Sequence, residues 1–299
     1  MLRRALLAVL VAVCLVIPLA AQTVGGGYLD LYIVNVKPEK SAEFEALAKK
    51  LADANRKYNG DRWLAMDVMY GQNNTTVFVS HRDAYGDIDK AYDSFMGALN
   101  KAYGKEASQK MLNEWNSYLV SSRSELRRRR WDLSRKAPAG EDAYVKLIAN
   151  ARVLRTTTVH IRPGRSADFE VILKEVEAAG EKNENTQPLL VSQGMEGTTG
   201  TTYYITALRP GMDGFDKNPT MHEILGDEGY KRYLKDVSET IESSESAILR
   251  YSAELSAPSP QIIAAAPAFW QPKTEVAAAS PKPKKAKQPM EPAAQKEKQ

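Results

Sequence analysis

The order of apolar and polar positions along the chain predicts alternating strands and helices. Residues 28–37 are rich in β-branched and aromatic residues, which predicts a strand, and Pro38 ends it where a first helical turn tolerates proline. Phe44, Leu47 and Leu51 then recur at helical spacing. The same reasoning predicts further strands over 63–70 and 75–81, helices over 87–103 and 106–121, and a last strand over 124–133.

The second half of the chain repeats this order. Val34–Glu45 matches Val159–Glu170 at an offset of 125 residues, with the Pro, Ser, Ala, Phe and final Glu identical. The offset is 126 between 71–80 and 197–206 and 122 for the last helix and strand, so gaps fall where loops are expected. This pattern indicates a duplication. The second copy is predicted to hold strands over 189–195 and 201–207, helices over 217–226 and 228–243, and a last strand over 246–255.

Each copy therefore has the order β-α-β-β-α-α-β, an elaboration of the split βαβ plan of ferredoxin-like domains. We expect an α+β fold with a first module over 28–134 and a second over 146–256. Helices cover one face of such a sheet, and the other face has to be covered as well. The two copies can cover each other, which predicts a pseudo-dimeric α+β barrel formed within one chain. A monomer is then a plausible state.

The N-terminal segment has the composition of a secretory signal peptide. Arg3 and Arg4 precede an apolar run over 5–19, and Ala20-Ala21 supply small residues for cleavage. The alternative is a membrane anchor, but the run is short for a span of about 20 residues. Cys14, the one cysteine, lies inside this segment, so the mature chain has no disulfide. We expect a periplasmic or secreted bacterial protein without an integral membrane span after cleavage.

The C-terminal segment, 257–299, is rich in Ala, Pro and Lys and predicts a disordered tail. Its lysines could contact anionic material of the cell envelope, while Ile262-Ile263 and Phe269-Trp270 could dock on the folded part. The positive net charge of the chain comes from this tail and the signal segment. Because residues 22–256 are close to neutral, we expect no nucleic-acid binding.

Two short motifs resemble a known group of proteins. Lys37-Pro-Glu-Lys40 leads into Ala42–Glu45, and Arg162-Pro-Gly-Arg165 leads into Ala167–Glu170. Together with the element order, they resemble the dimeric α+β barrel superfamily, which includes antibiotic-biosynthesis-monooxygenase-like and NIPSNAP-like domains. The resemblance implies the fold and a range of roles, among them cofactor-independent oxygenases, haem-degrading enzymes and small-molecule lyases.

The first functional hypothesis is binding of a small apolar or aromatic ligand without a cofactor. The alternatives are a cofactor-independent or haem-linked monooxygenase-like enzyme, and a cell-envelope interaction protein that uses the basic tail. No metal-ligand spacing such as HExxH and no nucleophile elbow occurs in the sequence. Whether the protein is an enzyme is left open.

The three histidines are the first candidates for chemistry. Strand alternation predicts that His160, and Asn35 at the matching position of the first copy, face the barrel, as catalytic or ligand contacts or as ordinary polar residues. By the resemblance, His222 has the position of an axial haem ligand, and a surface helix histidine is the alternative. His81 is expected to be a solvated loop residue.

The run Arg127–Arg130 is the most unusual charged segment. Alternation places Arg127 and Arg129 on one face, where they could bind an anion or a carboxylate. The alternatives are a charged edge strand or arginines paired with acids such as Asp30. Aromatic residues, Phe78 and Tyr204 among them, could line an apolar ligand cavity between sheet and helices, or could simply be core.

Overall fold

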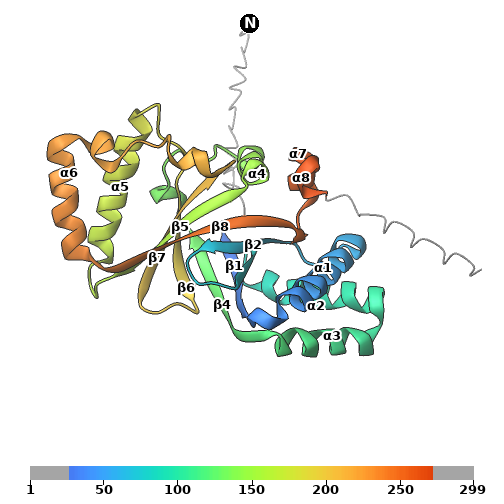
Figure 1. Ribbon diagram of the computed structural model, residues 1–299. Helices are drawn as coiled ribbons and strands as arrows, with labels where there is room; N and C mark the ends of the chain where they lie inside the picture. Colours follow the sequence, from blue (N-terminus) through green and yellow to red (C-terminus); the bar gives the residue numbers. More distant parts are fainter. Residues whose placement is uncertain (1–26, 272–299) are drawn as a thin grey trace, which may run out of the picture.

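A computed structural model describes residues 27–271, which form a closed antiparallel barrel (Figure 1). Around the barrel the strand order is β1-β3-β2-β8-β5-β7-β6-β4. The strands are β1 Tyr28–Val36, β2 Trp63–Tyr70, β3 Thr75–Arg82, β4 Leu119–Arg129, β5 Val153–Ile161, β6 Leu190–Glu196, β7 Thr201–Arg209 and β8 Ile241–Ala257.

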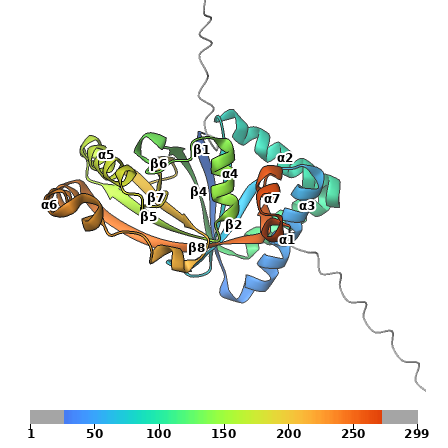
Figure 2. The same cartoon turned by 90° about the horizontal axis from the view of Figure 1, so that it is seen from above.

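The helices of the two modules lie on opposite sides of this barrel (Figure 2). Those of the first module are α1 Ser41–Tyr58, α2 Gly86–Tyr103 and α3 Lys105–Ser117, and those of the second are α5 Ser166–Lys182 and α6 Met221–Thr240. The α4 helix, Glu141–Asn150, joins the modules, and α7 Pro260–Ala265 and α8 Pro267–Trp270 follow β8. Short 3-10 turns occupy Pro38–Lys40, Trp131–Leu133 and Met212–Phe215.

The barrel closes because the last strand of each module pairs with a strand of its own module on one side and with a strand of the other module on the other side. β4 pairs with β1 of its own module and with β6 of the second module. β8 in turn pairs with β5 of its own module and with β2 of the first. The predicted pseudo-dimeric α+β barrel within one chain is confirmed by this pairing.

Alternation along the strands sorts side chains between two kinds of core. On β1, Val34 and Val36 pack against Phe44 of α1, whereas Leu31 and Ile33 belong to the core inside the barrel. On β5 the corresponding helix-side residues are Val159 and Ile161, which pack against Phe169 of α5. The interior of the barrel is thus a third core, built from both modules.

Glycines at the two predicted hairpins allow close contact with the last strand of the other module. A side chain at Gly197, where φ is 72°, would place its Cβ 2.1 Å from the backbone oxygen of Ser124 on β4. In the β2–β3 hairpin, a Cβ at Gly71 would lie 3.1 Å from that of Ala247 on β8. Both positions have φ values that favour glycine.

The strand registers correct one part of the repeat alignment. Asn35 pairs with Thr75, and the matching His160 pairs with Thr202 rather than Thr201. The second hairpin is therefore one residue longer than the aligned sequences suggested. A slip of one residue exchanges the two faces of a strand, so Phe78 and Tyr204, which the alignment made equivalent, point to opposite sides of the sheet.

Several predicted boundaries were also wrong. β4 begins at Leu119, inside the helix predicted over 106–121, and β8 begins at Ile241, inside the helix predicted over 228–243. The helix predicted from 217 begins at Met221, because Thr220 and Glu223 form a capping box there. The break predicted near 226 is real, since Gly226 has a non-helical φ of 68° within α6.

The α4 helix was not predicted, and the tail was predicted to begin too early. Tyr144 and Ile148 of α4 are buried in the barrel core, together with Ile262 of α7 and Trp270 of α8. The prediction of a disordered tail from 257 was therefore wrong for residues 258–271, which are folded, and the alternative that this segment docks on the folded part is the one observed. The signal segment, with Cys14, and residues 272–299 lie outside the described residues.

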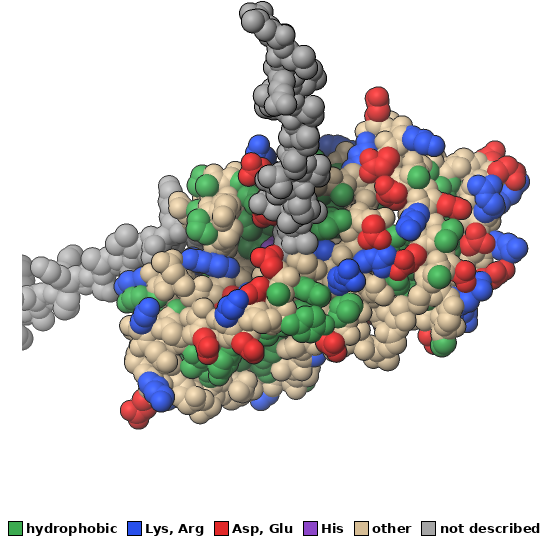
Figure 3. Space-filling view, turned by 180° about the vertical axis from the view of Figure 1, so that it is seen from behind, with side chains coloured by type: hydrophobic (Ala, Val, Ile, Leu, Met, Phe, Trp, Pro, Cys, Tyr) green, Lys and Arg blue, Asp and Glu red, His purple; other side chains and the backbone are tan. Residues whose placement is uncertain are grey.

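The exposed surface carries charges of both signs. On the face shown in Figure 3, Lys and Arg side chains alternate with Asp and Glu over most of the molecule. Between residues 27 and 271 there is no helix whose length and hydropathy would suit a membrane crossing.

We expect Trp270→Ala to lower the free energy of unfolding by about 3–5 kcal/mol, the range for deleting a buried large aromatic side chain. Trp270 is fully buried, donates from Nε1 to the Ala149 oxygen at 3.0 Å, and packs edge-on against Tyr251. Urea denaturation measures the change. Tyr70→Ala, at an aromatic residue that is 62% exposed, is the control and should change little. An equal effect of the two substitutions would contradict the docking of α8.

Candidate functional site

Two cavities lie on the two faces of the first module's sheet. The helix-side cavity lies between that sheet and α1–α3, and its volume is about 450 Å³. Tyr32 of β1 and Phe78 of β3 are opposite each other on the floor, with ring centroids 6.5 Å apart. Most of the lining is aromatic or aliphatic, including Trp63, Phe95, Leu112 and Trp115.

One end of the helix-side cavity is polar and acidic. Arg82 is buried and donates from both terminal nitrogens to the two oxygens of Asp61, each at 2.8 Å. Its Nε also donates to Asp30 Oδ2 at 3.2 Å. Two carboxylates thus share one guanidinium, and this end of the cavity has a surplus negative charge. Asp30 pairs with Arg82 and not with the arginine run, which corrects the alternative considered from the sequence.

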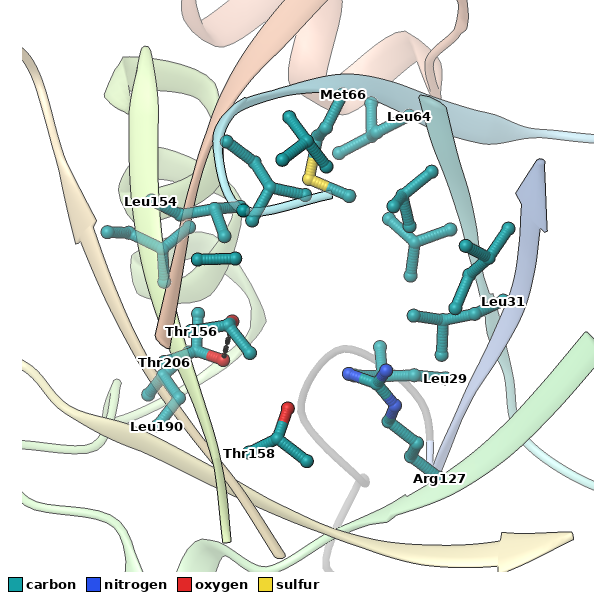
Figure 4. Close-up of a pocket in the computed structure, with 18 of the residues that line it drawn as sticks. Leu29, Leu31, Leu64, Met66, Arg127, Leu154, Thr156, Thr158, Leu190 and Thr206 are labelled. Atoms are coloured by element: carbon teal, nitrogen blue, oxygen red, sulfur yellow. Dashed lines mark hydrogen bonds between the residues drawn. The ribbon is translucent and has the colours of Figure 1, made fainter. Parts of the chain in front are cut away.

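The second cavity, called the barrel cavity below, occupies the interior of the barrel and measures about 290 Å³ (Figure 4). Its walls come from both modules, because Leu31 of β1 and Leu154 of β5 face each other across the same space. Thr156 and Thr206 are hydrogen-bonded at 2.8 Å on one wall, while the guanidinium of Arg127 points inward from another. Further apolar lining residues are Leu29, Leu64, Met66 and Leu190.

A buried ion pair lies on the β4 wall of the barrel cavity. Arg127 donates from Nε to Glu125 Oε2 at 2.9 Å and stacks on Tyr204, whose hydroxyl donates to the same oxygen at 3.0 Å. Burial by itself would raise the pKa of Glu125. The positive charge of Arg127 and the hydrogen bonds that Glu125 accepts, including one from Arg123, hold that pKa below its ordinary value. Burial is also the main reason that the pKa of Tyr204 rises to about 12.

A second polar cluster closes the end of the barrel that α4 covers. Tyr144 of α4 lies 2.7 Å from His81 Nε2, and Arg129 donates to both Tyr144 Oη and His81 Nε2. Burial, together with the charges of Arg129 and Arg82, lowers the pKa of His81 to about 3, so the imidazole is neutral. The sequence missed this cluster: His81 was expected in a solvated loop, but it lies on β3 and lines the cavity.

The arginine run belongs to an interior strand of the sheet and not to an edge, because β4 is paired on both sides. Arg127 and Arg129 share the inner face, as alternation predicted, and both line the barrel cavity. Arg128 is exposed, and Arg130 forms ion pairs with Asp132 and Glu170. Only half of the run therefore faces the cavity.

His160 and Asn35 occupy barrel-facing positions at the hairpin end of their strands, outside the lining of the barrel cavity. Asn35 donates to Thr75 Oγ1 at 3.2 Å, and His160 Nδ1 lies 3.1 Å from Thr202 Oγ1. The two residues make matching contacts in the two modules. These contacts give them a structural role, and their catalytic role stays a prediction.

His222 does not fit a haem site in this structure. Its Nε2 lies 2.7 Å from Asp227 Oδ1, its ring packs against Tyr230, and about half of its side chain is exposed. It lines neither the helix-side cavity nor the barrel cavity. Within residues 27–271, no three His, Cys, Asp or Glu side chains are grouped as metal ligands.

Comparisons with known proteins find similar folds only. No family model matches the sequence, and no curated protein matches it. A candidate monooxygenase from Lactobacillus acidophilus aligns at a TM-score of 0.47 and 9% identity over 75% of this chain and 93% of its own. An anthrone oxidase-like protein aligns at a TM-score of 0.48 and 12% identity, over 75% of this chain and 91% of its own. A chlorite dismutase variant from Candidatus Nitrospira defluvii aligns at a TM-score of 0.44 and 8% identity, over 77% of this chain and 92% of its own.

We expect Glu125→Gln to lower the free energy of unfolding by about 3 kcal/mol at neutral pH, because it leaves Arg127 buried without its carboxylate. Since the folded state lowers the pKa of Glu125, its contribution is fully present above the ordinary carboxyl pKa of about 4.3 and is lost as pH falls further. The difference from the wild type should therefore shrink below about pH 4. Urea denaturation from pH 7 to 3 measures it.

The matched control for this prediction is Glu245→Gln, at the exposed carboxylate on β8 that also lines the barrel cavity. It should change the free energy of unfolding by less than about 0.5 kcal/mol at every pH. A difference for Glu125→Gln that stays constant down to pH 3 would contradict the assignment of the ion pair.

His222→Ala should leave the absorbance spectrum of the protein unchanged after haem is added, because the imidazole is half exposed and lines neither the helix-side cavity nor the barrel cavity. A Soret band that the substitution abolishes would instead establish His222 as an axial ligand.

Proposed function

We propose that the protein binds a small aromatic molecule with a hydrogen-bond donor, such as a phenol, in the helix-side cavity. The observation that carries this proposal is the combination of an aromatic lining with an acidic end. Tyr32, Phe78 and Trp115 supply ring faces and edges against which another ring can pack. Asp30 and Asp61 supply acceptor oxygens at the end where a polar substituent would lie.

The charge of the acidic end determines which substituents are compatible. A hydroxyl or an N–H group can donate to Asp30, whose side chain is 28% exposed and shares only Oδ2 with Arg82. A ligand carboxylate would face two acids and a single arginine that is already fully engaged with both. The cavity therefore favours neutral donors over anions.

The volume of the helix-side cavity limits the size of the ligand. Its roughly 450 Å³ lies within the range of small-molecule sites. At about 30 Å³ for each non-hydrogen atom, the volume water has in the liquid, it holds about fifteen such atoms. This corresponds to two fused rings with a substituent.

The sequence supports this proposal from a different direction. The Pro-containing motifs resemble the dimeric α+β barrel superfamily, whose members bind ligands between sheet and helices, the position of the helix-side cavity. The predicted signal peptide would bring the protein to the periplasm or the cell exterior, where it would meet such molecules. A cofactor-independent oxygenase acting on the same aromatic ligand is the second hypothesis, and the basic tail as an envelope contact is a third.

We expect 2-naphthol to bind with one-to-one stoichiometry, measured by isothermal titration calorimetry, and to perturb the fluorescence of Trp63 and Trp115, which line the cavity. 2-Naphthoate has the same rings with a carboxylate in place of the hydroxyl, and it should bind at least about tenfold more weakly, a difference of about 1.4 kcal/mol. Equal affinity for the two compounds would contradict the role of the acidic end.

Leu112→Trp should fill the helix-side cavity and weaken 2-naphthol binding at least about tenfold. The matched control is Leu234→Trp, because Leu234 aligns with Leu112 in the repeat but is 48% exposed on α6. Oxygen uptake in the presence of 2-naphthol separates the hypotheses: a binding protein leaves dissolved oxygen unchanged, whereas an oxygenase consumes it.

A further inference from the structure

The barrel cavity is open at one end and closed at the other. Gln72, Arg123 and Glu245, which line it near the hairpins, are exposed. Tyr144 and Ile148, which line it from α4, are buried. The strand registers place these two groups at opposite ends, since β4 runs from Arg123 near the hairpins to Arg129 beside Tyr144. The cavity is therefore a blind apolar pocket with its mouth at the hairpins.

This cavity carries a surplus of positive charge. Arg123, Arg127 and Arg129 line it, and the carboxylates beside them are Glu125 and Glu245. Within residues 27–271, no carboxylate lies within salt-bridge distance of Arg129, whose guanidinium donates instead to the neutral Tyr144 and His81. The barrel cavity is thus opposite in charge to the acidic end of the helix-side cavity.

Two buried donors beside Tyr144 have no acceptor in the described part of the chain. The Nε of Arg129 and the Nε1 of Trp131 are both buried and make no hydrogen bond with residues 27–271. The two side chains are neighbours, with the guanidinium carbon of Arg129 5.3 Å from the centre of the Trp131 ring. A buried donor left without a partner costs about 1–3 kcal/mol, so Arg129, which lines the closed end of the cavity, is suited to an acceptor that residues 27–271 do not supply.

We propose that the barrel cavity binds a small monocarboxylate with an apolar body, its carboxylate held by Arg129 at the closed end. The guanidinium of Arg127, which is paired with Glu125, points into the same space (Figure 4). Leu29, Leu31 and Leu154 surround the apolar body. At about 30 Å³ for each atom, the cavity of about 290 Å³ holds about ten non-hydrogen atoms, the size of octanoate.

The sequences of the two modules differ on the cavity walls, so the two walls of the proposed site are not equivalent. On the β8 wall, the positions that correspond to Arg127 and Arg129 are Leu249 and Tyr251, and both line the cavity. At these positions a symmetric dimer would carry four arginines around its axis, whereas this chain carries two on the β4 wall and Leu249 and Tyr251 on the β8 wall. One carboxylate in one orientation is therefore the expected occupancy.

Isothermal titration calorimetry of the purified protein with octanoate and with octanamide tests the proposal. Octanamide has the same shape and no charge. We expect octanoate to bind with one-to-one stoichiometry and at least about tenfold more tightly than octanamide, and 2-naphthol should not displace it. Because this comparison uses the wild-type protein, it holds even where a substitution prevents folding.

Two substitutions, each with a control on the same strand, locate the site. Arg129→Met should weaken octanoate binding at least about tenfold and leave octanamide binding within about twofold, whereas Arg128→Met, at the exposed neighbour, should change neither. Thr158→Phe should fill the cavity and abolish binding of both compounds, whereas Thr157→Phe, on the opposite face of β5, should not.

Three results would overturn the proposal. Equal affinity for octanoate and octanamide would remove the role of the arginines. Octanoate binding that survives Thr158→Phe in a folded protein would place the site elsewhere. A failure of octanoate to bind at millimolar concentration would mean that Arg129 does not hold a carboxylate in this cavity. None of these results affects 2-naphthol binding in the helix-side cavity, so the two proposals can fail separately.

Discussion

The pairing of each module's last strand with both modules is the constraint on which the rest of the structure depends. β4 bridges β1 to β6, and β8 bridges β5 to β2, so each module completes the sheet of the other. Without this pairing, both sheets would have unpaired edges and an apolar open face. The interior core, with Leu31 of one module and Leu154 of the other, exists only because the barrel is closed.

The same pairing separates two chemical environments across one sheet. Successive residues of β1 and β3 point alternately to the helices and to the barrel interior. Asp30 and Phe78 therefore face the helix-side cavity, and Leu29 and His81 face the barrel cavity. Arg127 and Arg129 of β4 line the barrel cavity, whereas Asp30 and Asp61 lie at the polar end of the helix-side cavity, so the two cavities differ in charge. The two faces of the first module's sheet thus carry cavities of different character.

Much of the fold could be predicted from periodicity, but the candidate site could be predicted only in part. The inward direction of Arg127 and Arg129 follows from strand alternation, as does the barrel-facing position of His160. The partner of His81 could not be predicted, because Tyr144 lies on α4, for which neither caps nor a repeat gave a signal. Phe78 and Tyr204 were predicted to lie on the same face of their sheets, because the alignment did not show that the second hairpin is one residue longer and shifts the register.

The sequence by itself determined the duplication, the order of elements in each module and the two faces of most strands. These depend on local periodicity and on similarity between segments, both of which can be seen along the chain. Only the tertiary structure decided which charges meet and where space is left. Glu125 meets Tyr204 across 79 residues, and Trp270 reaches Ala149 across 121. Such contacts are set by barrel closure and by hairpin length, which no local pattern encodes.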